Sequence, residues 1–311
     1  MNKQRMKRIW QGFWQLADPK IWIASTVPFG VGTVYAFRQT GNIAPYWIVI
    51  SLIALYLLEI GKNGVNEIID FWSGVDCYVS EEERTPFSGG KKTIVDNKLT
   101  VSEVAVISVL TVGLGCLIGI YIVWVRELRV LWVGIVGVLL ALAYSLPPFK
   151  LAYRGLGELT VAVTFGPLIV TGAYLVQASY FSLQIILLSV PIGLLIANVL
   201  WFNQYPDYEA DRKGNKRNWV VRLGKKKATY VYGFIYLLTY VSFITLAIVF
   251  NSLFWLLPLV SIPLAGEAVD TARKYHDDLS RLLKANLRTI QVYQLTGITM
   301  VAAALLEKFL G

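Results

Sequence analysis

Two short stretches of this chain, NEIIDFWSGVD and NQYPDYEAD, each begin with an asparagine, continue with acids and follow an apolar run. The oxygen-bearing residues of the first acidic motif are Asn66, Glu67, Asp70 and Asp76, and those of the second acidic motif are Asn203, Asp207 and Asp211. The leading asparagines are 137 residues apart (66 to 203), and so are the first aspartates (70 to 207). This matched spacing indicates a pseudo-repeat.

Carboxylate and amide oxygens are hard ligands that suit Mg²⁺. Proteins usually hold this ion through a few carboxylates together with the phosphates of a substrate. We therefore predict that all the residues of the two motifs are Mg²⁺ ligands and that the motifs face each other across a diphosphate. Asp70 and Asp207 are expected to be catalytic as well. The alternative is that these acids are ordinary solvated charges at helix ends.

The local shape of each motif also follows from its spacing. Asn203, Asp207 and Asp211 have the i, i+4, i+8 spacing of one helix face, although Pro206 argues against a straight helix there. In the first motif the last acid comes after Gly74, so the chain must turn to bring that acid back.

Basic and aromatic residues close to the motifs could bind the same diphosphate. The segment ERTPFSGGKK supplies Arg84, Lys91 and Lys92, and the segment YSLPPFKLAYRGLGE supplies Tyr144, Lys150, Tyr153 and Arg154. Guanidinium and ammonium groups can neutralise a diphosphate as it leaves. We predict catalytic roles for the two arginines and substrate-binding roles for the other five residues. The alternative for each basic residue is a membrane-surface anchor.

The composition indicates the elements that position these residues. The chain has 311 residues, of which 56% are hydrophobic and only 16% charged, whereas soluble domains carry about a quarter charged residues. Apolar runs long enough to cross a bilayer recur along it. We predict an all-α membrane protein with about nine transmembrane helices in one bundle, forming a single domain over 1–311. The spans are expected near 21–37, 45–65, 102–124, 130–147, 157–178, 183–205, 228–249, 252–266 and 290–309.

The distribution of lysine and arginine predicts the orientation. With a cytoplasmic N-terminus, 25 of the 29 basic residues fall on the cytoplasmic side. This bias follows the positive-inside rule. Residues 1–20 then form a basic cytoplasmic leader, and 66–101 and 206–227 form cytoplasmic active-site loops. The basic residues are spread over several loops, which argues against a nucleic-acid partner.

Two cysteines and one histidine exclude a disulfide framework and a metal site built from these residues. The chemistry must therefore rest on carboxylates, amides and basic groups.

With these blocks in place, the chain resembles the UbiA-type intramembrane prenyltransferases, and most closely their 1,4-dihydroxy-2-naphthoate polyprenyltransferase (menaquinone) branch. The resemblance covers most of the chain between about 60 and 225. It implies a helical bundle around a central cavity and a Mg²⁺-bound polyprenyl diphosphate between the acidic motifs. It also implies an aromatic acceptor, a lipid bilayer as the surroundings, and a prokaryotic cell membrane as the location, with the active site facing the cytoplasm.

Two positions depart from the family pattern. Glu67 stands where an aspartate is common, and Asp18-Pro19-Lys20 replaces the usual Arg-Pro, so a diphosphate contact there would come from Lys20. Both departures leave the acceptor open between a naphthoate and another lipid-quinone precursor, such as a hydroxybenzoate or a homogentisate.

Two other classes of membrane protein fit the sequence less well. A CDP-alcohol type transferase would show an acidic pattern that this chain lacks, and an ion or solute transporter would place its acids near mid-span. The segment 267–288 is expected to form an amphipathic cytoplasmic helix. Its role, the prenyl chain length and the oligomeric state are not predicted.

Overall fold

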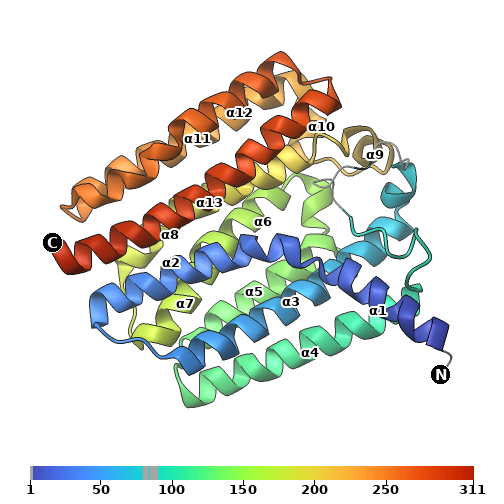
Figure 1. The fold of residues 1–311 in the computed structure, drawn as a ribbon. Coiled ribbons are helices and arrows are strands. Elements are labelled where there is room, and N and C mark those ends of the chain that lie inside the picture. The colour runs from blue at the N-terminus through green and yellow to red at the C-terminus, as the bar shows by residue number, and fades with distance from the viewer. Residues whose placement is uncertain (1–2, 80–83, 85–89) are drawn as a thin grey trace.

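The computed structural model of this protein describes residues 3–79, 84 and 90–311, and within them every regular element is helical (Figure 1). Long helices run side by side in one bundle, and the two chain ends lie at opposite ends of it (Figure 1). This arrangement fits an odd number of membrane crossings. We call the end that carries α1 and α9 the acidic end, because both acidic motifs lie there.

Each expected span corresponds to a helix or to consecutive helices. They are α2 (Ile23–Thr40), α3 (Pro45–Trp72), α4 (Val101–Val125), α5 (Val130–Ser145), α6 (Gly157–Val163) continuing through η5 (Thr164–Leu168) into α7 (Ile169–Ala178), α8 (Leu183–Asn203), α11 (Lys225–Val249), η6 (Leu253–Ser261) continuing into α12 (Ile262–Lys274), and α13 (Leu279–Leu310). Seven of these segments in the described chain are long and apolar enough to span a membrane, whereas α2 and the 16-residue α5 fall short of that standard. The protein is an integral membrane protein.

The lipid-facing surface accounts for the apolar composition. Trp124 is 87% exposed, Leu253 80% and Ile248 74%, on helices whose other faces pack inside the bundle. Large apolar side chains in contact with water are costly, but in contact with acyl chains they are not.

Most of the buried apolar residues fall into two clusters. The larger cluster is formed by α2, α7, α8, α11, α12 and α13, with Tyr35, Tyr174 and Trp255 buried in it. A smaller cluster joins α1 (Lys3–Ala17) to α3 and α4. Close approach of α3 and α4 depends on Gly64, because a Cβ there would collide with the Ser108 hydroxyl.

The helix ends differ from expectation at two places that matter. α3 continues seven residues past the expected end near 65, so that most of the first acidic motif is helical. The expected helix over 267–288 is instead the end of α12, a turn, and the start of α13. The turn forms because Asp278 caps α13, its side chain accepting from the Arg281 backbone N–H.

Candidate active site

The two acidic motifs meet through one lysine. Lys216 lies after α9 (Tyr208–Lys213), and its Nζ is 3.1 Å from Asp70 Oδ2 and 3.7 Å from Asp211 Oδ1. Asp70 comes from the first motif and Asp211 from the second, and both are buried. The fold therefore brings the two acidic motifs together around the positive charge of Lys216.

Asp70 is held on its other oxygen by Tyr153. The Tyr153 hydroxyl donates to Asp70 Oδ1 at 2.6 Å and lies 2.6 Å from the Ser73 hydroxyl. Tyr153 belongs to η4 (Leu151–Arg154), and the Arg217 N–H donates to its carbonyl, so the segment after α5 is tied to the loop that carries Lys216. Burial, followed by the negative charge of Asp70, raises the pKa of the Tyr153 hydroxyl, which keeps it protonated as a donor.

Asp76 returns to the site as expected. Gly74, with φ of 79°, turns the chain after α3 into η2 (Val75–Tyr78), which carries Asp76. Lys92 Nζ lies 3.7 Å from Asp76 Oδ1, and Gly90 packs so closely on this carboxylate that a Cβ would collide with it. The other oxygen, Asp76 Oδ2, is buried and accepts no hydrogen bond from the described residues. It remains available to a ligand.

Glu67, a predicted ligand, accepts three hydrogen bonds from the segment 91–94. Its Oε1 accepts from the Thr93 hydroxyl and the Ile94 N–H, and its Oε2 accepts from the Lys91 N–H. These three bonds satisfy a buried carboxylate. They fix the segment 91–94 against α3, which favours a positioning role.

The second motif is bent, as Pro206 led us to expect. α8 ends at Asn203, and α9 begins at Tyr208 with Asp207 just before it, so the three predicted ligands do not share one straight helix face. Asn203 Oδ1 accepts from Asn286 Nδ2 of α13 at 3.0 Å. Asp211 Oδ2 accepts from Asn218 Nδ2 at 2.7 Å. Asn66 donates to the Ser145 hydroxyl at 3.1 Å, which leaves its amide oxygen for a ligand.

The two arginines expected to be catalytic are both bound to protein groups. Arg84 Nη1 lies 2.7 Å from Asp96 Oδ1. Arg154 is exposed, and its Nη2 donates to the Pro148 carbonyl at 2.8 Å. Each contact uses part of a guanidinium. In the segment that carries Arg84, Ser88 and Gly89 lie outside the described residues.

The expected substrate-binding residues are spread around the same end. Lys91 Nζ pairs with Asp18 Oδ2 at 2.7 Å, and Lys20 is exposed on η1 (Pro19–Trp22). Lys150 Nζ lies 5.0 Å from the centre of the Tyr153 ring, a cation–π distance. Tyr144 of α5 is half-buried and packs beside the cluster formed by Ile69, Val75, Ala152 and Tyr153.

Charge is concentrated in this site. Burial raises the pKa of Asp76 to about 7, with Asp70 contributing in the same direction and Lys92 opposing it. Burial likewise raises the pKa of Asp211 to about 7, against the lowering effect of Lys216. Burial works against the charge of Lys216, but Asp211 and Asp70 outweigh it and hold its pKa well above its usual value. Burial thus favours the protonated form of both carboxyls, and a bound cation would favour the charged form instead.

The donor set fits Mg²⁺ supplied together with a phosphate ligand. In the described part of the chain no three acidic, histidine or cysteine side chains converge closely enough to hold an ion by themselves. Mg²⁺ is commonly held by one or two carboxylates plus substrate oxygens. Asp76 Oδ2, which is buried and accepts no hydrogen bond from the described residues, is a hard oxygen that fits such an ion.

Sequence reasoning did not single out Lys216 or Asn218 as functional. The sequence did contain a signal, because KGNKRN follows the acids of the second motif directly and its glycine and asparagine allow a turn back.

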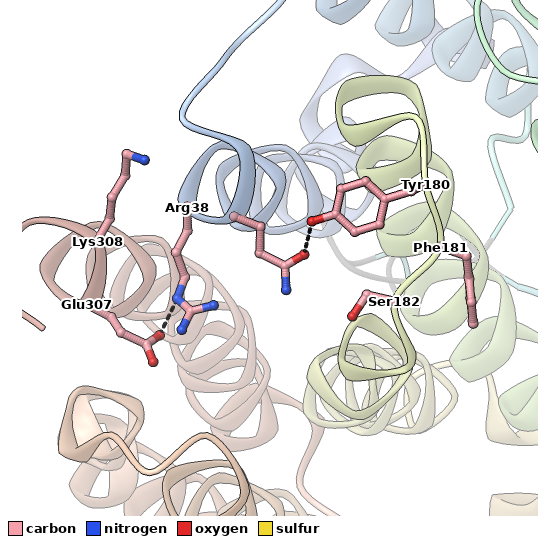
Figure 2. A pocket seen from close by; sticks show the side chains of 7 residues that line it. Arg38, Tyr180, Phe181, Ser182, Glu307 and Lys308 are labelled. Carbon is pink, nitrogen blue, oxygen red and sulfur yellow. Dashed lines mark hydrogen bonds and ion pairs between the residues drawn. The ribbon is translucent and has the colours of Figure 1, made fainter.

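Two of the hollows in the described structure differ in their position relative to the acids. One, of about 160 Å³, is lined by Tyr205, Pro206 and Lys225 among others, next to the second motif. The other, of about 600 Å³, lies at the opposite end of the bundle, where Arg38, Glu307, Lys308 and Tyr180 surround it (Figure 2). Arg38 Nε is 2.6 Å from Glu307 Oε2 there. Neither the acidic motifs nor Lys216 reach this larger hollow.

Comparison with known proteins gives one family. Residues 25–287 match the UbiA prenyltransferase family. UbiA prenyltransferase domain-containing protein 1 of Xenopus tropicalis is 27% identical over 285 residues, covering 90% of this chain and 79% of that protein. The 1,4-dihydroxy-2-naphthoate octaprenyltransferase of Bacillus subtilis is 26% identical over 269 residues, covering 86% of this chain and 83% of that protein.

A solved structure has the same fold. A UbiA homolog from Archaeoglobus fulgidus bound to GPP and Mg²⁺ superposes with a TM-score of 0.65 at 15% identity, over 94% of this chain and 99% of that one.

Proposed function

This chain belongs to the UbiA prenyltransferase family, enzymes that transfer prenyl groups, and from that premise we propose that it moves a polyprenyl group from its diphosphate to 1,4-dihydroxy-2-naphthoate. The reaction would depend on Mg²⁺ and serve menaquinone synthesis. The observation that carries the proposal is the contact of Lys216 with both Asp70 and Asp211, which places a cation between the two acidic motifs.

The residues of the site would have three roles: holding Mg²⁺, binding the diphosphate and orienting Asp70. Asp70, Asp76, Asp207 and Asp211, with the amide oxygens of Asn66 and Asn203, would hold Mg²⁺, which when bound supplies positive charge to the diphosphate oxygens. Lys216 and Lys92 would bind the same oxygens directly and stabilise the charge that develops on pyrophosphate as the allylic C–O bond breaks. Tyr153 keeps Asp70 oriented.

The buried surroundings serve the cationic intermediate. An allylic cation reacts with any water that reaches it, so the acceptor carbon must be the nearest nucleophile. Asp70, Asp76 and Asp211 are each at most 3% exposed, which supports a site with little water.

The proposed acceptor, 1,4-dihydroxy-2-naphthoate, rests on the motifs and on one named relative. The B. subtilis relative is named for 1,4-dihydroxy-2-naphthoate, and the resemblance of the motifs points to the same branch. The X. tropicalis relative is equally distant, so identity does not separate the branches. A hydroxybenzoate or homogentisate acceptor is the alternative within the family.

The test is a reconstituted assay. Purified protein in lipid would be incubated with Mg²⁺, a polyprenyl diphosphate and 1,4-dihydroxy-2-naphthoate, and product followed by mass spectrometry. A prenylated, decarboxylated naphthoquinol supports the proposal. Pyrophosphate release only with another aromatic acceptor would change the substrate, and no release with any acceptor from folded protein would favour a transporter.

A further inference from the structure

A polar stripe on α3 leads from the first acidic motif into the spanning part of the helix. Counting back from Asp70, Asn66, Asn63 and Glu59 lie four, seven and eleven residues away, which at 3.6 residues per turn keeps all four on one face. At 1.5 Å per residue, Glu59 lies about 16 Å below Asp70.

Glu59 is a buried carboxylate with half of its hydrogen-bonding capacity unused. The residue is 7% exposed. Its Oε1 accepts a hydrogen bond from the Ser25 hydroxyl of α2, whereas its Oε2 is buried and accepts none from the described residues. A buried carboxylate oxygen without a donor is costly, which makes a ligand hydroxyl a fitting partner.

The surroundings of Glu59 are aromatic and polar on one side. Trp22 and Tyr56 stack with ring centres 4.4 Å apart, and Tyr56 shares a hydrogen bond with Thr26. Tyr293 of α13 donates to the carbonyl of Ala24, beside Ser25. These contacts hold α2, α3 and α13 together around the carboxylate.

The polar residues of the stripe lie only in the half of α3 that ends at the acidic site. α3 begins at Pro45, and from there to Leu58 it carries no charged residue; from Glu59 onward it carries Lys62 and the polar face described above. A cation path would continue through the apolar half to the other end of the bundle. A stripe that stops halfway fits a substrate pocket whose mouth is the acidic site.

We infer that Glu59 binds a hydroxyl group of the aromatic acceptor through its free Oε2 and takes the hydroxyl proton as the new carbon–carbon bond forms. The inference rests on the proposed function and adds a residue for the acceptor at the inner end of the stripe, opposite the donor diphosphate. Intramembrane carboxylates are expensive and are retained where they serve a substrate.

The steps balance. The prenyl C–O bond breaks and its electron pair leaves with pyrophosphate. The acceptor ring carbon bonds to the prenyl carbon while the hydroxyl becomes a ring carbonyl and its proton passes to Glu59. The ring then loses CO₂, or, where the attacked carbon carries no carboxylate, passes the proton of that carbon to the released pyrophosphate, and the freed electron pair restores the aromatic ring. The carbonyl oxygen takes the proton back from Glu59, which ends as it began.

The experiment compares Glu59→Gln with the unmutated protein on both substrates. We expect the kcat with the acceptor to fall about 100-fold, the size of effect typical of a lost general base. The KM for the prenyl diphosphate and the slow pyrophosphate release without acceptor should stay within twofold. Glu127→Gln is the control, since its side chain is 9% exposed in the loop at the opposite end of the bundle and should keep full activity.

Several outcomes would overturn the role of Glu59 in the acceptor step. An acceptor kcat/KM within threefold of the unmutated value overturns the inference, and so does a parallel loss of prenyl diphosphate binding, which would make Glu59 part of the donor site or the fold. If Glu59→Gln does not fold, Glu59→Asp is measured instead. We expect its kcat/KM for the acceptor to fall at least tenfold, and an unchanged value would contradict the inference. No product from the unmutated protein with any hydroxylated aromatic would overturn the proposed function, and this inference with it.

Discussion

The ammonium nitrogen of Lys216 lies 3.1 Å from Asp70 Oδ2 although the two residues are 146 positions apart in the chain. The same nitrogen lies 3.7 Å from Asp211 Oδ1. A single cation between two buried carboxylates relieves their repulsion and marks the point at which an anionic diphosphate and its metal would enter.

Replacing Lys216 should weaken binding of the donor. In Lys216→Met, we expect the KM for the prenyl diphosphate to rise more than tenfold, because a charge-assisted contact to phosphate is lost and the carboxylates repel each other. Lys216→Arg should recover part of the loss. Steady-state kinetics with varied prenyl diphosphate measures this, and Lys7→Met, an exposed lysine of α1 at the same end of the bundle, is the control. Equal effects of both methionine variants would argue for a general charge effect.

Removing the Tyr153 hydroxyl should disturb Asp70 without emptying the site. Tyr153→Phe loses the 2.6 Å bond to Asp70 Oδ1 and should lower kcat about tenfold, with a loss in the free energy of unfolding of about 1 kcal/mol. Kinetics and a thermal melt in detergent check both numbers. An unchanged kcat would mean that Lys216 alone orients Asp70.

Gly90 should tolerate no side chain. Its φ is 78°, and a Cβ would collide with Asp76 Oδ1, so Gly90→Ala should displace the segment that carries Lys91 and Lys92 and lower activity at least tenfold. Gly266→Ala in α12 is the matched control, since a Cβ there meets nothing within 4 Å. That variant should keep activity and be as stable as the parent or more so. An active Gly90→Ala would show that the loop can move away from Asp76.

Magnesium binding should strengthen as the pH rises. The pKa of Asp76 and of Asp211 is raised to about 7, so both carboxyls hold protons below that pH and the metal must displace them. Between pH 8 and pH 6 the affinity for Mg²⁺ should fall about tenfold for each carboxyl involved. Calorimetric titration of Mg²⁺ with a non-reacting diphosphate analogue measures it, and a flat profile would remove these carboxyls from the ligand set.

The stability of the metal-free protein should change in the opposite direction. Both carboxyls bind protons more tightly when folded than when unfolded, where their pKa is about 3.9. Their contribution to the free energy of unfolding is therefore full below pH 4 and is lost as the pH rises through 7. Denaturant unfolding without Mg²⁺ at pH 5 and pH 7.5 compares the two, and greater stability at the higher pH would contradict the assignment.

The ion pair of Arg38 and Glu307, at the end of the bundle opposite the acidic motifs, should contribute to stability and not to activity. Glu307 pairs with Arg38 Nε at 2.6 Å (Figure 2). It also accepts from Trp255 Nε1 at 2.9 Å, and its side chain is 8% exposed. Glu307→Ala leaves a half-buried guanidinium without its partner, and should lower the free energy of unfolding by roughly 3 kcal/mol. Prenyl transfer at a temperature where the variant is folded should equal that of the parent. A selective loss of activity would connect this end to the reaction.

The sequence by itself determined the class, the spans and the two acidic motifs. Each depends on local pattern: apolar length sets a membrane helix, Pro206 and Gly74 break or turn the chain where the structure does, and lysine and arginine counts predict the orientation. Side-chain type at fixed spacing also identified Asp70 and Asp211 as candidate ligands, because metal chemistry limits the choice.

Only the tertiary structure decided which groups face each other. The placement of Lys216 depends on how a loop after α9 returns across the bundle, and the use of Glu67 depends on a segment more than twenty residues later that donates three hydrogen bonds to it. The unpartnered oxygen of Glu59 became visible only when α2 packed against α3 and satisfied its other oxygen. Spacing fixes which residues share one helix face, whereas contacts between distant segments depend on packing and loop paths that no local pattern encodes.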